Sequence, residues 1–220
     1  MKGLKLTLIV IVTGLLFAST LQAEIGIKLG VNGSRLRDMG TVMGTNETMK
    51  NLLGFEGGVF VSLPIVPHIL YLQPEALWVQ RGGKLNLPQT GTIQQRETRY
   101  KLNYIEIPVL LKVKFPGVVA PYILAGGYGA FKMSSKRVIK VSGTQTEDIK
   151  IKTNLKNMDW GLVGGVGVDF KIGMAKILIE GRYEVGLTKI FKTDADIFVP
   201  PTTAEIGKNS RIVGMIGIAL

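Results

Sequence analysis

Apolar residues recur at every second position along residues 104–115, and this is the clearest pattern in the chain. One parity carries the branched aliphatic side chains Ile105, Ile107, Val109, Leu111 and Val113 and ends in Phe115. The other parity carries Glu106, Lys112 and Lys114. Because side chains of a β-strand point alternately to opposite faces, this spacing predicts a strand with one apolar and one charged face.

Eight largely apolar stretches run through the chain from residue 24 to its end. We interpret them as strands at residues 24–34, 54–64, 69–82, 100–115, 120–132, 158–170, 175–187 and 210–220. The connections between them are alternately long and short. In a meander this alternation places every long connection at one end and every short turn at the other, as in bacterial outer-membrane barrels. The sequence therefore predicts an all-β fold, an eight-stranded antiparallel up-and-down transmembrane barrel.

Charged residues on these strands lie on one face and most large apolar residues on the other. The charged set comprises Lys28, Glu56, Glu75, Glu106, Lys112, Glu180, Arg182, Glu184 and Arg211. Two closed barrels fit the pattern: a soluble barrel with an inward apolar face, or a membrane barrel whose apolar face meets lipid. We favour the membrane barrel, because one face is aliphatic or aromatic nearly throughout whereas the other carries few charges. The charged set is then predicted to form a mutually neutralising ion network in the lumen.

Glycine and aromatic positions agree with this interpretation. Gly161, Gly165 and Gly167 share the parity of the charges and suit the crowded interior of an eight-stranded barrel. Aromatic residues near the predicted strand ends are expected to form girdles at the two membrane interfaces. They are Trp78, Tyr100, Phe115, Tyr122, Trp160 and Phe170.

The first residues have the layout of a secretory signal peptide. Lys2 and Lys5 precede an apolar run at residues 6–18, and Ala23 offers a small residue for cleavage. We predict a signal peptide at residues 1–23 and a barrel domain at residues 24–220, with an uncleaved anchor helix as the alternative. The chain has no cysteine, which excludes disulfides, thiolate metal sites and a lipoprotein anchor.

Five segments also resemble a known family, the PorT-like outer membrane β-barrel domain family of Bacteroidota-type proteins. They are "GIKLGVNGS", "LYLQPEALWVQRGGKL", "YIEIPVLLKVKF", "APYILAGGYGAF" and "DWGLVGGVGVDF". The resemblance covers residues 24–220 and implies a small outer-membrane barrel without a demonstrated activity. The chain departs from many outer-membrane strands by ending in Leu220 rather than in an aromatic residue.

A formal net charge of +11 draws attention to the basic segment at residues 133–157. Its cations are Lys136, Arg137, Lys140, Lys150, Lys152 and Lys156. The pieces "RVIKV" and "DIKIKT" are expected to extend the fifth and sixth strands beyond the bilayer as a hairpin. Cations there would pair with lipopolysaccharide phosphates, unless the segment is simply a solvated loop. Secretion and the absence of a clustered aromatic platform argue against nucleic acid.

Candidate catalytic and metal-binding residues are scarce. His68 is the only histidine and falls in a predicted short turn, so Ser–His chemistry has no base near the long loops. Glu180 and Glu184 share a strand face, which permits acid–base work, but a structural ion network is the stronger interpretation. We expect no catalysis, no metal and no cofactor.

These observations predict a monomeric integral protein of the cell outer membrane in a Gram-negative envelope. Its lumen is expected to be plugged, and its role to be structural or an interaction through basic outer loops. Expected partners are outer-membrane lipid and, during insertion, the barrel-assembly machinery. Two alternatives stay open: a soluble periplasmic ligand-binding barrel, and an accessory component of envelope assembly or protein secretion.

Overall fold

The computed structural model of the protein describes residues 23–37, 52–87, 96–141, 144–150, 156–189 and 208–220. All of the predicted signal peptide except Ala23 lies outside these residues, so that segment stays a prediction. Within the described ranges, no helix has the length and apolar character needed to cross a membrane.

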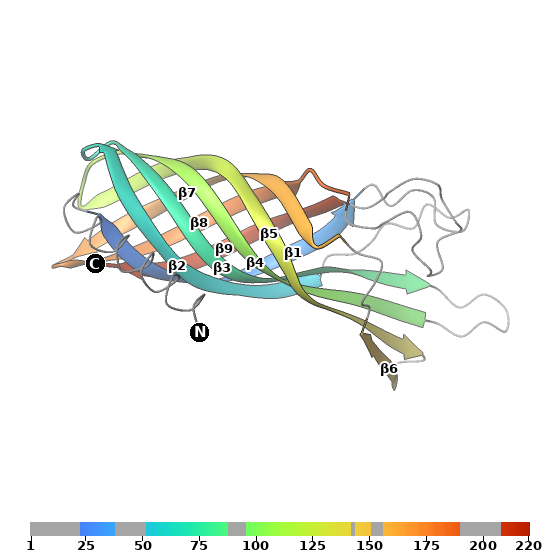
Figure 1. The fold of residues 1–220 in the computed structure, drawn as a ribbon. Helices are drawn as coiled ribbons and strands as arrows, with labels where there is room; N and C mark the ends of the chain where they lie inside the picture. Colours follow the sequence, from blue (N-terminus) through green and yellow to red (C-terminus); the bar gives the residue numbers. More distant parts are fainter. Residues whose placement is uncertain (1–22, 38–51, 88–95, 142–143, 151–155, 190–207) are drawn as a thin grey trace, which may run out of the picture.

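Nine strands form a single antiparallel sheet (Figure 1). They are β1 (Glu24–Arg37), β2 (Leu52–Val66), β3 (Leu70–Leu87), β4 (Arg96–Lys114), β5 (Val119–Val141), β6 (Thr144–Lys150), β7 (Met158–Ile172), β8 (Ala175–Gly186) and β9 (Lys208–Ala219). The order is β4-β3-β2-β1-β9-β8-β7-β5-β6, and pairing of β4 with β5 closes eight of these strands into a barrel. The predicted all-β, eight-stranded antiparallel meander is confirmed.

Three barrel strands run well past the others at the end of the long connections. β3, β4 and β5 have 18, 19 and 23 residues, whereas β8 and β9 have 12 each. Figure 1 shows the three projecting from the barrel, with β6 alongside β5 and the C-terminus at the opposite end. We call this projection of β3–β6 the extended sheet.

The expected extension of two barrel strands as a hairpin is half right. β5 does continue to Val141, and it pairs there with β6. β6 is a separate strand rather than a continuation of β7, so the expected extension of the sixth barrel strand is wrong. The reason lies in the pairing of β5, whose partner is β7 up to Phe131 and β6 only from Lys136 onward.

Short turns close the other end of the barrel, which we call the turn end. The turn between β2 and β3 contains His68 at a φ of 66°, a left-handed conformation in which histidine is enriched among non-glycine residues. Gly173 has a φ of 62° between β7 and β8, where a residue without a Cβ adopts this conformation at no steric cost. At the seam, Leu220 N–H donates to the carbonyl of Ile25 at 2.9 Å.

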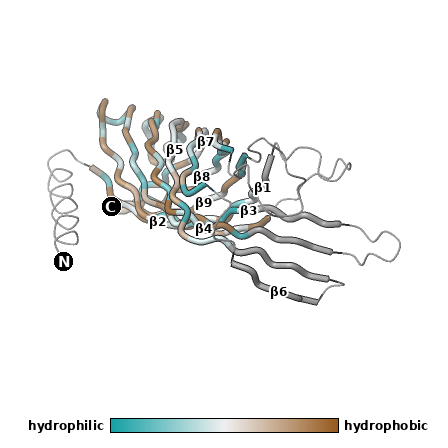
Figure 2. The backbone as a smooth tube through the Cα atoms, turned by 45° about the vertical axis from the view of Figure 1, so that its right-hand side comes forward, coloured by the Kyte–Doolittle hydropathy of each residue, from teal (hydrophilic) through white to brown (hydrophobic). Residues whose placement is uncertain are grey.

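The aliphatic parity points away from the barrel axis on every barrel strand. Leu29, Val59, Ile123, Val166 and Ile216 are each 51–65% exposed. Figure 2 shows the resulting alternation of hydrophobic and hydrophilic positions along the strands. The alternative prediction of a barrel with its regular apolar face pointing inward is therefore wrong.

Candidate functional site

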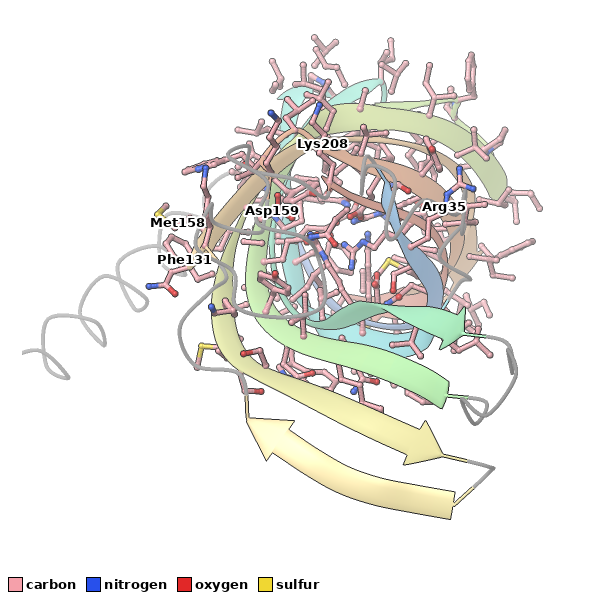
Figure 3. The ribbon with its side chains drawn as sticks, turned by 90° about the vertical axis from the view of Figure 1, so that its right-hand side faces the viewer. Arg35, Phe131, Met158, Asp159 and Lys208 are labelled. Carbon is pink, nitrogen blue, oxygen red and sulfur yellow. The ribbon has the colours of Figure 1, made fainter. Side chains whose placement is uncertain are left out.

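Charged side chains occupy much of the barrel interior. All nine charged residues singled out from the sequence are 3% exposed or less: Lys28, Glu56, Glu75, Glu106, Lys112, Glu180, Arg182, Glu184 and Arg211. In Figure 3, which views the ring of strands from the end of the extended sheet, Asp159 lies inside the ring, whereas Met158 and Phe131 lie outside it. The contacts fall into three groups along the barrel.

The middle group joins two acids to two bases. Lys28 Nζ donates to Glu75 Oε1 at 2.8 Å and to Glu180 Oε2 at 3.2 Å. The Arg182 guanidinium donates to Glu75 from both terminal nitrogens, at 2.8 and 2.6 Å, and also pairs through Nε with Glu180. Tyr122 completes the set by donating its hydroxyl hydrogen to Glu180 Oε2 at 2.8 Å. The bidentate arginine contact fixes both distance and orientation, because the fork of donors matches the carboxylate.

The outer group lies nearer the extended sheet and is built around two arginines. Arg211 donates to Glu56 at 2.8 Å and to Glu106 at 2.6 Å, and it also pairs with Glu184. Arg81 pairs with Glu106 and donates to Asp159 Oδ2 at 2.8 Å. Its guanidinium lies 5.2 and 4.7 Å from the ring centroids of two interior tyrosines, Tyr104 and Tyr128.

The turn-end group places one carboxylate between two lysines. Asp169 Oδ2 accepts from Lys114 Nζ at 2.6 Å and from Lys112 Nζ at 3.2 Å. Lys112 Nζ lies 3.7 Å from the centroid of the Tyr122 ring, which places the ammonium over an aromatic face. Tyr122 therefore links this group to the middle group.

Arg81, Asp159 and Asp169 belong to the interior network although the predicted set omits them. Each has the parity of the charged face of its strand, and each is 3% exposed or less. Parity alone would have found all three. The structure uses every charged residue of that parity on β3 and β7 up to the turn end.

Aliphatic side chains also occupy parts of the interior. One buried cluster consists of Leu77, Val79, Val213 and Met215, and a second contains Phe60 and Leu178. The interior is thus charged in some layers and apolar in others. Apolar residues at these inward positions fill volume between the ion pairs without requiring hydrogen-bond partners.

Tyr122 was expected in an interfacial girdle, and this expectation is wrong. Its side chain is 1% exposed, because its even position on β5 points inward and its hydroxyl has a carboxylate partner there. Trp78, Trp160 and Phe115 do point outward, with 44%, 53% and 55% exposure. The side chain of Tyr100 lies outside the described residues.

The predicted basic patch lies largely on the extended sheet. Lys136, Arg137 and Lys140 are in β5, and Lys150 ends β6. In the register of the sheet, Lys136 lies opposite both Lys101 of β4 and Lys150 of β6. Lys156 lies in the connection that leads to β7, and Lys152 is outside the described residues.

The described side chains provide no group of three or more metal-ligating residues. His68 lies at the turn end, far in the fold from the outer group and its carboxylates. The interior carboxylates are themselves held by arginine or lysine. This arrangement orders the lumen and leaves its acids engaged with bases.

Comparison with known proteins places the chain in a family. A family model described as outer membrane protein beta-barrel domain matches residues 17–192. The chain belongs to this family. The narrower PorT-like resemblance stays a prediction, and no curated relative matches the chain.

Solved structures of outer-membrane barrels are similar to this chain at low identity. The attachment invasion locus protein Ail of Yersinia pestis has 15% identity and a TM-score of 0.42, covering 90% of this chain and 99% of that one. Neisserial surface protein A has 10% identity and a TM-score of 0.43, covering 89% and 96%.

Proposed function

We propose that this family member is an integral protein of the outer membrane whose lumen is plugged by its own ion pairs. Its role is structural, or an interaction made through the extended sheet and the long connections. The observation that supports this proposal is the inverted polarity of the barrel. Leu29, Val166 and Ile216 are 65%, 62% and 56% exposed, while Glu75 and Arg182 in the same wall are 3% and 2% exposed.

Water outside the barrel would not favour this arrangement. Burying a charged group costs several kcal/mol unless it is paired, and exposing rows of large aliphatic side chains to water forgoes about 25 cal/mol for each Å² left unburied. Hydrocarbon around the barrel removes the second cost. A closed barrel also satisfies every strand edge, as a membrane-spanning sheet requires.

The proposed role includes no catalysis. Interior acids such as Glu106 and Glu184 are tied to Arg211, so none is presented to a substrate as a free acid or base. Insertion would proceed through the barrel-assembly machinery, and the inserted protein would be a monomer. Neither insertion nor the monomeric state requires a cofactor.

Cations of the extended sheet are the proposed contact with lipopolysaccharide phosphates. Lys136 and Lys150 are opposed in the sheet, and Lys101 lies on the other side of Lys136. Like charges at directly opposed positions of a sheet are unfavourable, and a phosphate bound at these positions would offset that cost through charge-assisted hydrogen bonds.

Fractionation of cells tests the membrane location. We expect the protein in the outer-membrane fraction, extractable only with detergent and with a gel mobility that changes on heating. Release of folded protein by osmotic shock would contradict the proposal and favour a soluble periplasmic barrel. Crosslinking in intact envelopes tests the accessory role in assembly or secretion, which requires a reproducible protein partner.

Neutralising the basic patch tests the contact with lipopolysaccharide. A variant with glutamine at positions 136, 137, 140, 150, 152 and 156 should lose most of the rise in unfolding temperature that lipopolysaccharide gives to the detergent-solubilised protein. Arginine at positions 136, 140, 150, 152 and 156 keeps every positive charge of the patch and is the matched control, which should keep that rise. An equal loss in both variants would contradict a contact that depends on the positive charge of the patch.

A further inference from the structure

A cavity of about 460 Å³ opens at the turn end of the barrel. Residues from the turns after β2 and β4 line it, together with the adjoining ends of β7 and β8 and the C-terminal Leu220. Its charged lining consists of Glu24, Lys114, Asp169, Lys171 and Lys176. Tyr71, only 7% exposed, contributes an aromatic wall and lies with its ring centroid 5.8 Å from Lys114 Nζ.

Positive charge exceeds negative charge among the side chains of this cavity. Asp169 pairs both with Lys114, which lines the cavity, and with Lys112 of the same strand. One carboxylate is therefore shared by two ammonium groups. Lys176 is paired with Glu24. Lys171 has no ion pair among the described residues. Four lysines therefore stand against the carboxylates of Asp169 and Glu24 and the C-terminal carboxylate of Leu220, which leaves one uncompensated positive charge around one concave space.

Burial of two of these lysines increases the effect of the excess positive charge. Lys112 is 3% exposed, and the side chain of Lys114 is 10% exposed, so water screens these two charges only weakly. Elsewhere in the barrel the middle group balances two bases with two acids. At the turn end, cations outnumber acids beside a cavity open to solvent.

We propose that this cavity binds a phosphate-sized dianion, with Lys114 and Lys171 as its principal ligands and Lys176 at its edge. Lysine ammonium groups bind phosphate as point charges. The carboxylate of Asp169 competes with the bound anion for Lys114, because the two side chains form an ion pair. The binding requires only the folded turn end, so its failure would leave the proposed membrane location and the contact with lipopolysaccharide untouched.

Titration with inorganic phosphate tests the site on the folded, detergent-solubilised protein, by calorimetry at constant ionic strength maintained with chloride. We expect saturable binding to one site. Lys171→Gln and Lys114→Gln should each weaken it by roughly fivefold, the effect of one partly exposed ion pair. Asp169→Asn should strengthen it, because it frees Lys112 and Lys114 while keeping the shape of the side chain.

The opposite sign for Asp169→Asn separates a specific site from general loss of structure. Lys189→Gln, which removes an exposed lysine after β8 at the end of the barrel opposite the cavity, is the matched control and should bind phosphate as the unaltered protein does. Heat-modifiable mobility confirms that each variant is folded. Absence of saturable binding would overturn the proposal, as would an equal effect of Lys189→Gln and Lys171→Gln or weaker binding by folded Asp169→Asn.

Discussion

Glu75 is the residue on which the middle group of ion pairs depends. It accepts from Lys28 at 2.8 Å, from Gln73 at 2.7 Å and twice from Arg182, and it is 3% exposed. A carboxylate with this many donors contacts two bases at once, and Glu180 supplies the second negative charge of the group. Removal of Glu75 would leave Glu180 alone against both bases.

Replacing Glu75 by glutamine should therefore destabilise the barrel strongly. Removing one partner of a buried ion pair costs about 3–5 kcal/mol, because the remaining charge stays buried without compensation. Lys176→Gln breaks the partly exposed pair with Glu24 and should cost about 1 kcal/mol or less. Urea unfolding in lipid vesicles measures both. Equal costs would show that burial does not distinguish the two pairs.

Gly167 gives a second residue-scale prediction. A Cβ at this position would overlap the ring of Tyr122, whereas a Cβ on Gly164 of the same strand meets nothing within 4 Å. Gly167→Val should thus displace Tyr122 from Glu180 and cost about 1–3 kcal/mol through overpacking. Gly164→Val, on the outward face, should be nearly neutral. The comparison is made by the same urea unfolding, and a neutral Gly167→Val would contradict the packing described for the interior.

Strand alternation is the element-scale property that carried most information from sequence to structure. The parity of β4 placed Glu106 and Lys112 inside and Ile107 and Val109 outside, as the structure has them. Parity depends only on local geometry, so it can be read without knowing which strands pair. The partner of each charge could not be read in this way, because Arg81 and Asp159 come together only through closure of the barrel.

Strand ends were predicted less well than strand faces. β5 runs to Val141, and β6 is a strand in its own right, because hydrogen bonding to a neighbour can continue beyond the apolar stretch. Tyr122 shows the same limit for a single position. Its place near a strand end suggested a membrane interface, but inward parity and a carboxylate partner decide where its ring lies.

The outward face of β9 provides a prediction at the element scale. Ile216 lies in the middle of its outward set, between Ile212 and Ile218, and is 56% exposed. Arginine at the bilayer midplane of a barrel costs about 2–4 kcal/mol, and near the interface about 0–1. We expect Ile216→Arg to lower the free energy of unfolding in lipid vesicles by the larger amount. Val119→Arg, at the turn-end start of β5, should show the smaller one.

This pair of variants also discriminates between solvents around the barrel. In water, an arginine on an exposed strand face would have little effect at either position. Indistinguishable values for Ile216→Arg and Val119→Arg in vesicles would therefore contradict a hydrocarbon environment around β9. The same variants in detergent should retain the difference if the micelle covers the same band.

At the scale of the whole molecule, closure and filling of the barrel act together. Eight strands enclose a space that side chains can fill, and here the three ion-pair groups and the aliphatic clusters occupy it. The outer surface and the extended sheet are then the parts left to meet other molecules, apart from the cavity at the turn end. We therefore propose that the filled barrel, with its exposed projection, serves as an anchor or a contact surface rather than as a pore.

Electrical recording tests this view of the lumen. Protein reconstituted into planar bilayers should give no porin-like conductance steps, because Arg81, Arg182 and Arg211 each bridge carboxylates across the interior and an ion would have to displace them. Heat-modifiable mobility of the reconstituted sample confirms that folded barrels are present. Glu75→Gln, which leaves Lys28 and Arg182 with Glu180 alone, should raise brief openings before it raises any steady current. Stable conductance by the unaltered protein would contradict the plugged lumen and leave the ion pairs as the lining of a narrow channel.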